Sequence, residues 1–553
     1  MIIKLSKGLY EPFEDIEIEE GSTIEDLYFT KKEDVPYTVY AAKVNNKVVE
    51  LTFKLTKPCK VEFLDIRTQS ANLIFQYSLS LLFLKAAKDV VGKAQVGIMN
   101  SLNQGLYIDI STFEEITEEQ VEAIEKRMRE MVELDLPIKK ITVSVEEGIA
   151  MMVDDGFPEK TKLLSDNLNL KSMKFYSIGD YRDFFYGYMA PSTAYLKNFE
   201  LRKYKKGLLL RFPHRKNPDT IPEYEDQIML YDAFKKQSKW NKILGINFVA
   251  DLNQKIEDGL SRDIIQLSEA LHEKRIAEIA DIIAEEKKRI VLIAGPSSSG
   301  KTTFARRLII QLRVNGLDPI YLGTDDYFVE REDTPLDERG EPDYEILDAL
   351  DIKLFNDQMN GLLNGEEVDL CSFDFIKGKK EFGKRKLKMN KDQIIVIEGI
   401  HGLNENLTEF IPENDKFRIY ISPLTQMNID LHNRIPTTDE RMLRRLVRDY
   451  KYRDHSAQKT IREWPKVRAG EDDNIFPYSG KADVLFNSVH TYEIAVLKKY
   501  AEPLLKQITS DEPEYAEAVR MLKFLKYFKT IENDKAIVNN SILREFIGGS
   551  IFV

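Results

Sequence analysis

Apolar residues along this chain recur with two periods, and each period predicts a different element. Short continuous apolar runs, typical of buried strands, cover residues 290–294, 319–323, 394–398 and 417–421. Segments with the helical spacing of apolar residues cover 303–314, 351–363 and 439–451. Because these strands and helices alternate, we expect an α/β fold with a parallel sheet and helices on both faces.

The residues before this segment show shorter and more irregular patterns. Strand-like segments predict two hairpins near the start of the chain, the second of which turns at Asn45-Asn46. The apolar stretch Leu73–Ala87 is long enough for a buried helix, and Thr117-x-x-Gln120 is a capping box that opens another helix. This part is therefore expected to be a mixture of strands and helices.

A chain of 553 residues is too long for one hydrophobic core, so we divide it into five parts. They are a small mixed α/β module (1–65), an α+β domain (66–225), a helical connector (226–287), the α/β domain (288–510) and a tail (511–553). The tail contains one amphipathic helix over 514–528. Its apolar end, 546–553, is expected to dock on the body of the protein.

Composition narrows the class of protein. The chain is 43% hydrophobic and 31% charged, as in ordinary globular proteins, and its net charge of −12 argues against wholesale nucleic-acid binding. Cys59 and Cys371 are the only cysteines, which argues against a disulfide framework or a cysteine zinc site. Neither a signal-peptide core nor an apolar run of about 18–20 residues is present, so we expect a cytoplasmic protein.

Residues 295–302 match the phosphate-binding pattern Gly-x-x-x-x-Gly-Lys-[Ser/Thr], between a buried-type strand and a helix. The glycines let backbone N–H groups turn toward phosphate oxygens, Lys301 reaches the terminal phosphates, and the Thr302 hydroxyl can ligate Mg²⁺. The expected nucleotide-binding residues are Gly295, Ser297, Ser298, Ser299, Gly300, Lys301, Thr302 and Thr303. The order of strand, loop and helix makes a chance Gly/Ser-rich turn a poor explanation. The chain is predicted to bind ATP and Mg²⁺.

Two carboxylates follow strands that are expected to lie near this loop. Asp325 comes directly after the strand 319–323, where it would face the terminal phosphate and accept the proton of an attacking hydroxyl; Asp326 is the alternative base. Glu398 ends the strand 394–398 and suits a Mg²⁺ ligand, together with Thr302 and Asp325. A turn-forming Asp and an exposed strand-end Glu are the structural alternatives.

Four arginines share one face of a predicted helix. They are Arg441, Arg444, Arg445 and Arg448, at i, i+3, i+4 and i+7. Thr437-x-x-Glu440 is a capping box that would open this helix, and Arg453 lies just beyond it. Planar, permanently charged guanidinium groups suit a migrating phosphoryl group. The alternative is a solvated basic face paired with acidic neighbours.

Together these motifs resemble the uridine kinase and phosphoribulokinase family over about 288–510. The matching segments are Gly295–Thr302 (phosphate loop), Asp325-Asp326-Tyr327-Phe328 (Asp-Ser-[Phe/Tyr]-[Tyr/His]), Glu398-Gly399-Ile400 (Glu-Gly-Ile/Val) and Arg444–Asp449 (Arg-Arg-x-x-Arg-Asp, the start of the lid). The resemblance implies that Asp325 is the catalytic base, assisted by Lys301. It also implies that Arg445, Arg448 and Arg453 contact the triphosphate or the transferred phosphate.

The expected acceptor site departs from that family. Glu345 stands where uridine kinases have an Asp that holds ribose hydroxyls, and Phe373-Asp374-Phe375 is similar to their Tyr-Asp-Phe. The substrate-binding residues implied by the resemblance are Asp325, Phe328, Glu345, Phe373, Phe375 and Arg445. However, the family's base-reading His is Gly378 here, and a second lid Arg is His455. The resemblance therefore supports phosphoryl transfer more than pyrimidine selectivity.

The first 215 residues resemble a second family. Residues 41–45 are similar to the ubiquitin-like TGS module of threonyl-tRNA synthetase, and 66–213 look like its editing-type domain, with the best match at 183–193. The His-x-x-x-His, Cys and His ligands of that family are replaced here by Thr68, Asn72, Phe185 and Met189. These side chains lack the imidazole or thiolate of a hydrolytic site, so we expect the fold without the editing chemistry.

A basic segment, Lys197–Lys216, holds eight Lys/Arg and one Glu, with aromatic residues between them. Such a pattern can contact RNA weakly, although we favour a solvated hairpin face. The sequence thus predicts an ATP-dependent kinase acting on the 5′-hydroxyl of a nucleoside, without a membrane partner. The alternatives are a kinase for another hydroxylated acceptor, such as a sugar phosphate, and a nucleotide-gated RNA-binding protein. Homo-oligomerisation stays open.

Overall fold

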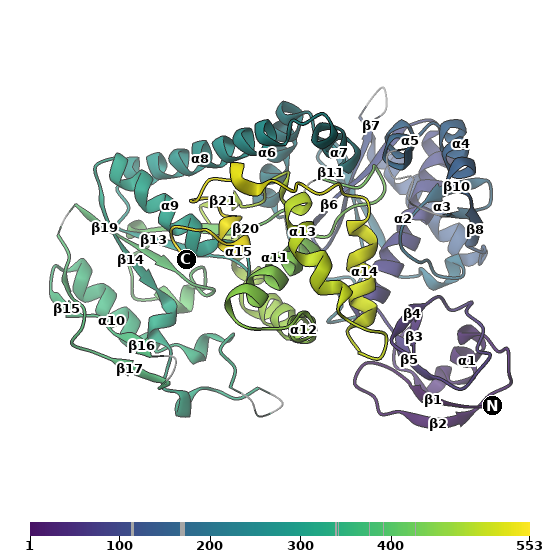
Figure 1. Cartoon of the computed structure of the whole chain (residues 1–553), viewed down its shortest axis with the longest axis horizontal. Coiled ribbons are helices and arrows are strands. Elements are labelled where there is room, and N and C mark those ends of the chain that lie inside the picture. Colours follow the sequence, from purple (N-terminus) through teal and green to yellow (C-terminus); the bar gives the residue numbers. More distant parts are fainter. Residues whose placement is uncertain are drawn as a thin grey trace.

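The computed structural model describes residues 1–111, 115–165, 172–337, 340, 342–374, 377–390, 392–425 and 427–553. In Figure 1 the N-terminal residues form the right-hand side, the phosphate-loop domain forms the left-hand side, and the C-terminal residues run across the middle. Among the described residues, no helix is both long and apolar enough to cross a membrane.

The N-terminal module is a five-stranded sheet in the order β2-β1-β5-β3-β4, covered by one helix. Its elements are β1 (Ile2–Ser6), β2 (Glu14–Glu17), α1 (Ile24–Thr30), β3 (Ala41–Val44), β4 (Lys47–Val49) and β5 (Lys60–Leu64). Both predicted hairpins are confirmed, since β1 pairs with β2 and β3 with β4, each antiparallel. Asn45 and Asn46 take positive φ angles of 45° and 62°, as a tight turn at this point requires.

The next region is built around the long apolar helix α2 (Gln69–Val91), which confirms the buried helix expected at Leu73–Ala87. One sheet contains β6 (Gln95–Leu102), β7 (Gly105–Ser111), β11 (Glu200–Tyr204) and β12 (Gly207–Arg211), and a second contains β8 (Lys139–Val143), β9 (Met173–Ile178) and β10 (Tyr181–Phe184). The other helices are α3 (Glu118–Glu133), α4 (Val145–Asp155) and α5 (Pro158–Ser165). The predicted capping box is confirmed: the Thr117 hydroxyl accepts from Gln120 N, and the Gln120 side chain accepts from Thr117 N.

Three helices connect this region to the phosphate-loop domain: α6 (Ile228–Leu244), α7 (Val249–Glu257) and α8 (Ser261–Glu285). The phosphate-loop domain has a parallel sheet in the order β14-β19-β13-β20-β21. Its strands are β13 (Ile290–Ala294), β14 (Asp318–Gly323), β19 (Gln393–Glu398), β20 (Lys416–Ser422) and β21 (Val484–Asn487). Its helices are α9 (Lys301–Val314), α10 (Ile352–Leu363), α11 (Thr437–Tyr452), α12 (Ala457–Asn474) and α13 (Glu493–Lys506). Two small hairpins pair β15 (Glu367–Asp369) with β18 (Lys386–Lys388) and β16 (Ser372–Asp374) with β17 (Lys379–Glu381).

Helices cover both faces of this parallel sheet, as the alternation of the sequence predicts. Val291 and Ile293 of β13 enter a core that includes α9, whereas Ile290 and Leu292 enter a separate core that includes α10. Successive side chains of a strand point to opposite faces, so a central strand buried on both sides must be apolar throughout. The protein is a multidomain α/β protein with the phosphate loop at the carboxyl edge of its parallel sheet.

The C-terminal segment contacts both sides of the molecule. The helix α14 (Tyr515–Leu525) packs against α13 and approaches β4, and α15 (Arg544–Ile547) packs against α11. Phe546 and Ile547 are buried, which confirms that this apolar segment docks, although Ile551 and Val553 at its end are exposed. The apolar effect pulls the tail onto the phosphate-loop domain.

Candidate active site

The phosphate loop joins β13 to α9 in the geometry that its sequence requires. A Cβ atom on Gly295 would lie 2.0 Å from the carbonyl oxygen of Ile421, and Gly300 has φ +85°, so both positions favour glycine. The Lys301 Nζ lies back over the loop and donates to the carbonyl oxygens of Gly295 (2.9 Å) and Pro296 (3.3 Å). The N-terminus of α9 and a lysine thus converge where an anion would bind.

Thr302 and Glu398, from the neighbouring strand β19, lie together beside the loop. The Thr302 hydroxyl donates to Glu398 Oε2 (3.3 Å), and the Tyr321 hydroxyl donates to the same oxygen (3.1 Å). Burial raises the pKa of Glu398, while Lys301 opposes this shift and Asp325 adds to it. A hydroxyl and carboxylate oxygens are the ligands that Mg²⁺ prefers, and Mg²⁺ commonly takes only one or two carboxylates beside substrate phosphates. The residues present therefore fit the ion.

Asp325 and Asp326 lie in the short helical turn Thr324–Tyr327, directly after β14. The Asp325 carboxylate is open to solvent but lies in a concave part of the protein, and the resulting desolvation raises its pKa, against the effect of Lys301. Asp326 points elsewhere: its carboxylate is 3.9 Å from the Arg385 guanidinium. Of the two candidate bases, Asp325 is the one whose charge interacts with the phosphate-loop lysine.

The arginine face of α11 divides into two groups with different environments. Arg441 and Arg444 are buried and hold the phosphate loop from behind: Arg441 Nε donates to Ser297 O (3.1 Å) and Arg444 Nη1 to Ser298 O (3.2 Å). Their charges are balanced by two buried carboxylates, Glu471 and Glu493. This pairing corrects the prediction that all four arginines present their guanidinium groups together.

The remaining arginines gather around one carboxylate, Asp449. Its oxygens lie 3.2 Å from Arg445 Nε, 2.8 Å from Arg448 Nη2 and 3.5 Å from Arg453 Nη1. Arg445 Nη1 also donates to the Ser297 hydroxyl (2.8 Å), at the phosphate loop. Three cations held by one buried anion leave a net positive cluster beside the loop.

The predicted capping box at the start of α11 is wrong. The N-cap is Pro436, without a side-chain hydrogen bond, so Thr437 is already inside the helix. Glu440 instead accepts from the hydroxyl of Thr425. A buried carboxylate requires a hydrogen-bonding partner, and this one lies outside its own helix.

Two carboxylates that sequence reasoning missed accept hydrogen bonds from the loop. Glu471 Oε1 accepts from Ser297 N (3.1 Å), and Glu545 Oε2 accepts from Thr303 N (3.3 Å) and the Thr303 hydroxyl (2.7 Å). These carboxylates come from α12 and from the docked tail. No local motif signals them, because 174 and 242 residues separate the partners.

The predicted acceptor residues lie on one side of the loop. The ring of Phe328 is 5.3 Å from that of Tyr344 and 5.9 Å from that of Phe373, in edge-to-face contacts. Burial and Glu471 raise the pKa of Glu345, whereas Arg445 and Lys301 lower it. Glu345 is therefore close to the cations of the candidate site. Phe375 lies outside the described residues.

Gly378, where the resembling family has a His, sits under a side chain. It has φ +68°, and a Cβ atom there would lie 2.7 Å from Arg331 Cβ. A larger residue would need Arg331 to move, so the structure is built for glycine at this position.

The four positions that replace the ligands of the editing domain serve local structure. Thr68 caps α2 by accepting from Ala71 N (3.4 Å), and Asn72 donates to Ile66 O (3.3 Å). Phe185 and Met189 are buried in the core around α2. The described residues contain no group of three or more His, Cys, Asp or Glu side chains arranged to hold a metal ion.

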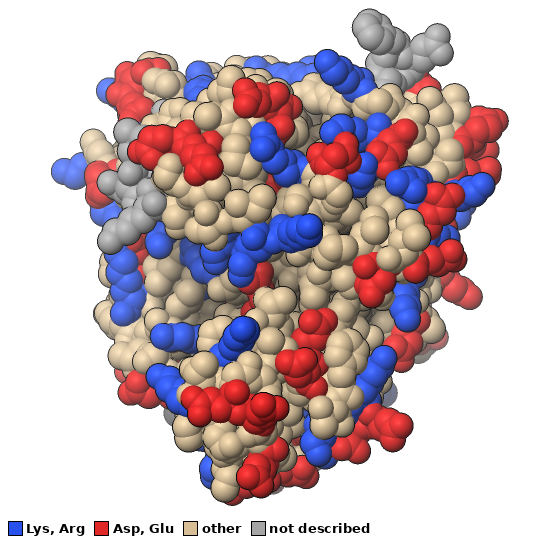
Figure 2. Space-filling view, turned by 90° about the vertical axis from the view of Figure 1, so that its right-hand side faces the viewer, with Lys and Arg blue, Asp and Glu red and all other residues tan. Residues whose placement is uncertain are grey.

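Most of the basic segment Lys197–Lys216 is paired or packed. Arg211 pairs with Glu200, and Lys216 with Asp473, while the Arg215 guanidinium lies 2.6 Å from Asp472. On the right-hand side of the molecule, Lys and Arg side chains are interspersed with Asp and Glu, as Figure 2 shows. Much of the positive charge predicted here is thus neutralised locally.

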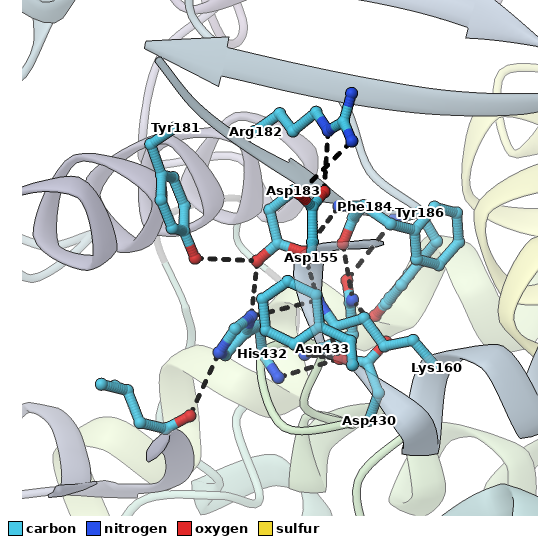
Figure 3. Close-up of polar contacts among 12 residues, drawn as sticks. Asp155, Lys160, Tyr181, Arg182, Asp183, Phe184, Tyr186, Asp430, His432 and Asn433 are labelled. Carbon is cyan, nitrogen blue, oxygen red and sulfur yellow. Dashed lines mark hydrogen bonds and ion pairs between the residues drawn. The ribbon is translucent and has the colours of Figure 1, made fainter. Parts of the chain in front are cut away.

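A buried ionic cluster joins the N-terminal region to the phosphate-loop domain (Figure 3). Lys160 of α5 forms ion pairs with Asp183 of β10 and, at 3.7 Å, with Asp430; the Lys160 Nζ also lies 3.0 Å from His432 Nδ1. All four side chains are buried. Desolvation would raise the pKa of Asp183, but Lys160 and His432 overcome it and hold the pKa at about 2. Sequence reasoning missed this cluster, whose members come from distant segments.

Comparison with known proteins gives two separate matches. The profile of the Phosphoribulokinase / Uridine kinase family matches residues 290–495. The threonine--tRNA ligase of Clostridium kluyveri is 28% identical over 187 residues, which cover 34% of this chain and 29% of the ligase. The chain thus spans less than a third of the length of this curated relative.

Two solved kinases share parts of the structure at low similarity. A putative fructose transport system kinase from Silicibacter sp. TM1040 is 18% identical, with a TM-score of 0.29, over 38% of this chain and 98% of that protein. A possible uridine kinase from Bacillus stearothermophilus is 19% identical, with a TM-score of 0.25, over 37% of this chain and 96% of that protein. The family profile carries the assignment: residues 290–495 form a domain of the phosphoribulokinase/uridine kinase family, and the N-terminal region is similar to threonine--tRNA ligase.

Proposed function

We propose that this protein is an ATP-dependent kinase that transfers the γ-phosphate to a hydroxyl group of a small acceptor. The observation that carries the proposal is the meeting of Lys301, Asp325 and Glu398 at the carboxyl ends of adjacent parallel strands. Their charges interact, since the Lys301 charge lowers the pKa of both carboxyl groups against the effect of burial. A cation, a free carboxylate and an oxygen ligand set are what phosphoryl transfer to a hydroxyl requires.

Each residue has a role in this proposal. The loop N–H groups and Lys301 bind the triphosphate, and Asp325 accepts the proton of the attacking hydroxyl. Thr302 and Glu398, with Asp325, would hold Mg²⁺, which neutralises phosphate charge when bound. Arg445, Arg448 and Arg453 stabilise the charge on the transferred group from the other side.

The acceptor that this site suits is a nucleoside with its 5′-hydroxyl toward Asp325. Phe328 and Phe373 offer aromatic surface for a flat base, and Glu345 can accept hydrogen bonds from ribose hydroxyls. Since Gly378 carries no side chain to read the base, we do not restrict the acceptor to pyrimidine nucleosides. A sugar phosphate is the alternative acceptor, and the basic cluster around Asp449 is the observation that favours it.

ADP release from Mg-ATP, measured against a panel of nucleosides and sugar phosphates, tests the proposal. The Lys301→Ala variant is the control, because it removes the charge at the terminal phosphates and leaves the acceptor residues in place. Acceptor-dependent release that disappears in Lys301→Ala supports a kinase and identifies its acceptor. Equal release from both proteins, or none with any acceptor while ATP still binds, contradicts it.

A nucleotide-gated RNA-binding protein is the second candidate. The similarity of the N-terminal region to threonine--tRNA ligase favours it. Filter binding of tRNA across a salt series, with and without ATP, distinguishes the two. Binding that falls steeply with salt and responds to ATP would favour this candidate, whereas salt-insensitive or absent binding would remove it.

A further inference from the structure

A cavity outside the candidate active site lies where three parts of the chain meet. It has a volume of about 370 Å³ and is lined by β4 of the N-terminal module, α2 and residues 186–188 of the next region, and α14 of the C-terminal segment. This volume is within the range of small-molecule sites. A site assembled from three separate parts of the chain can sense how they are placed relative to one another.

The lining of the cavity selects a chemical class of ligand. Its walls are mainly apolar and aromatic, with Tyr77, Tyr186, Tyr188 and Tyr515 among them. The Tyr77 hydroxyl is already bound, because it donates to the Tyr186 hydroxyl (2.7 Å). Such walls suit a flat, apolar body rather than a strongly hydrated one.

The polar groups of the cavity are cationic. Lys47, Arg520 and Lys523 line it, and no Asp or Glu is among its described lining residues. Arg520 is engaged by Asp439 and Glu517, but Lys523 forms no ion pair with the described residues, and its Nζ lies 4.4 Å from the centre of the Tyr188 ring. Burial lowers the pKa of Lys523, as expected for a cation without a paired anion. A ligand anion would supply that partner.

The cavity is connected to the phosphate loop through α14. One part of α14 lines the cavity, and its Arg520 grips Asp439, in the first turn of α11, with two hydrogen bonds of 2.6 and 2.7 Å. Farther along α11, Arg445 donates to the Ser297 hydroxyl of the phosphate loop. Beyond α14, the tail brings Ile542 against the loop, where a Cβ atom on Gly300 would lie 2.5 Å from Ile542 Cγ2. A ligand that fixes α14 would therefore also constrain the loop.

We propose that this cavity binds a small anion with a flat apolar body, such as an aryl carboxylate, and that its occupancy changes the affinity of the phosphate loop for ATP. The binding part of the proposal does not depend on the kinase function. The coupling part requires only that the loop binds ATP.

Calorimetric titration of the full-length protein with 2-naphthoate tests the binding. The comparators are 2-naphthamide, which keeps the ring but lacks the charge, and acetate, which keeps the charge but lacks the ring. We expect one naphthoate per chain, about tenfold weaker binding of the amide, and no measurable binding of acetate, because a charge-assisted contact is worth roughly 1.5–3 kcal/mol. Equal binding of acid and amide, or no binding of the acid at millimolar concentration, overturns the proposal.

Variants assign the binding to this cavity. Val519→Trp fills it and should abolish naphthoate binding, whereas Val153→Trp, on an exposed position of α4 (60% exposed), should not. Lys523→Gln should weaken the acid about tenfold and leave the amide unchanged, and this comparison stands even if Val519→Trp fails to fold. Lys301→Ala should bind naphthoate normally. Loss of binding in Lys301→Ala, or retention in a folded Val519→Trp, would place the ligand elsewhere and refute the assignment.

The ATP dissociation constant, measured with and without saturating naphthoate, tests the coupling. We expect a change of about fivefold or more, and the same factor in naphthoate affinity when ATP is saturating, since coupling between two sites is reciprocal. Asp439→Asn, which weakens the Arg520 contact, should reduce this factor toward one. An ATP dissociation constant that naphthoate does not change refutes the coupling, whatever the outcome of the kinase assay.

Discussion

Replacing the candidate base Asp325 by Asn is the sharpest test of the proposed chemistry. Asn has the same shape and cannot accept a proton, so the loop, Lys301 and Phe328 keep their positions. A positioned general base contributes about 10²–10⁴-fold, which corresponds to roughly 3–5 kcal/mol of the barrier. We therefore expect kcat to fall by that factor. Because the carboxylate repels phosphate oxygens, ATP affinity should stay the same or rise slightly.

The assay is ADP release at saturating acceptor, with the ATP dissociation constant measured separately. In the unchanged protein, the acid limb of the pH profile should lie above the ordinary Asp pKa of 3.8, because desolvation raises the pKa of Asp325 and only the ionised form accepts a proton. In Asp325→Asn this limb should disappear. Asp326→Asn is the matched control, since Asp326 faces Arg385, and should retain most activity. Full turnover in Asp325→Asn refutes this assignment, and loss in Asp326→Asn alone would transfer it to Asp326.

Three further predictions concern the ionic cluster, the docked tail and the acceptor site. Lys160→Met should lower the free energy of unfolding by about 3–5 kcal/mol, because Asp183 stays buried without its cation, whereas Lys162→Met, at a solvent-exposed pair, should cost under about 1 kcal/mol in urea unfolding. The pKa of Asp183, about 2, also predicts that the unchanged protein loses stability as pH falls from about 4 toward 2, and equal losses in the Lys160→Met and Lys162→Met variants would contradict the role of the cluster. Glu545→Gln should tighten ATP binding by about 3–10-fold, since it removes a negative charge from the N-terminus of α9, and weaker binding in calorimetry would instead make this carboxylate a support of the loop. Phe328→Ala should raise the KM for the acceptor about tenfold at an unchanged ATP dissociation constant, and a matching loss of ATP affinity would remove it from the acceptor site.

Local features of this protein could be predicted from the sequence because they depend on neighbours along the chain. The phosphate loop occupies eight consecutive residues, 295–302, and its glycines are dictated by backbone angles and close approaches within that segment. The hairpin turn at Asn45-Asn46 and the cap at Thr117 are likewise short-range. The alternation of apolar runs was sufficient for the parallel sheet, since a strand buried on both faces must be apolar throughout.

The composition of the candidate site could be predicted only in part. The sequence placed Asp325 and Glu398 at strand ends, and the parallel order of β14, β19 and β13 brings those ends to one edge. The helical spacing of the arginines was correct, but spacing gives no information on partners. Arg441 and Arg444 turned out to be buried because Glu471 and Glu493, from later helices, neutralise them.

Only the tertiary structure decided which distant groups share a site. Glu545 reaches Thr303 across 242 residues, and Asp183 meets His432 across 249. The effector cavity likewise needs β4, α2 and α14 to meet. Such contacts depend on how packed elements are placed in space rather than on the order of residues, so a single sequence read by its local patterns contains no signal for them.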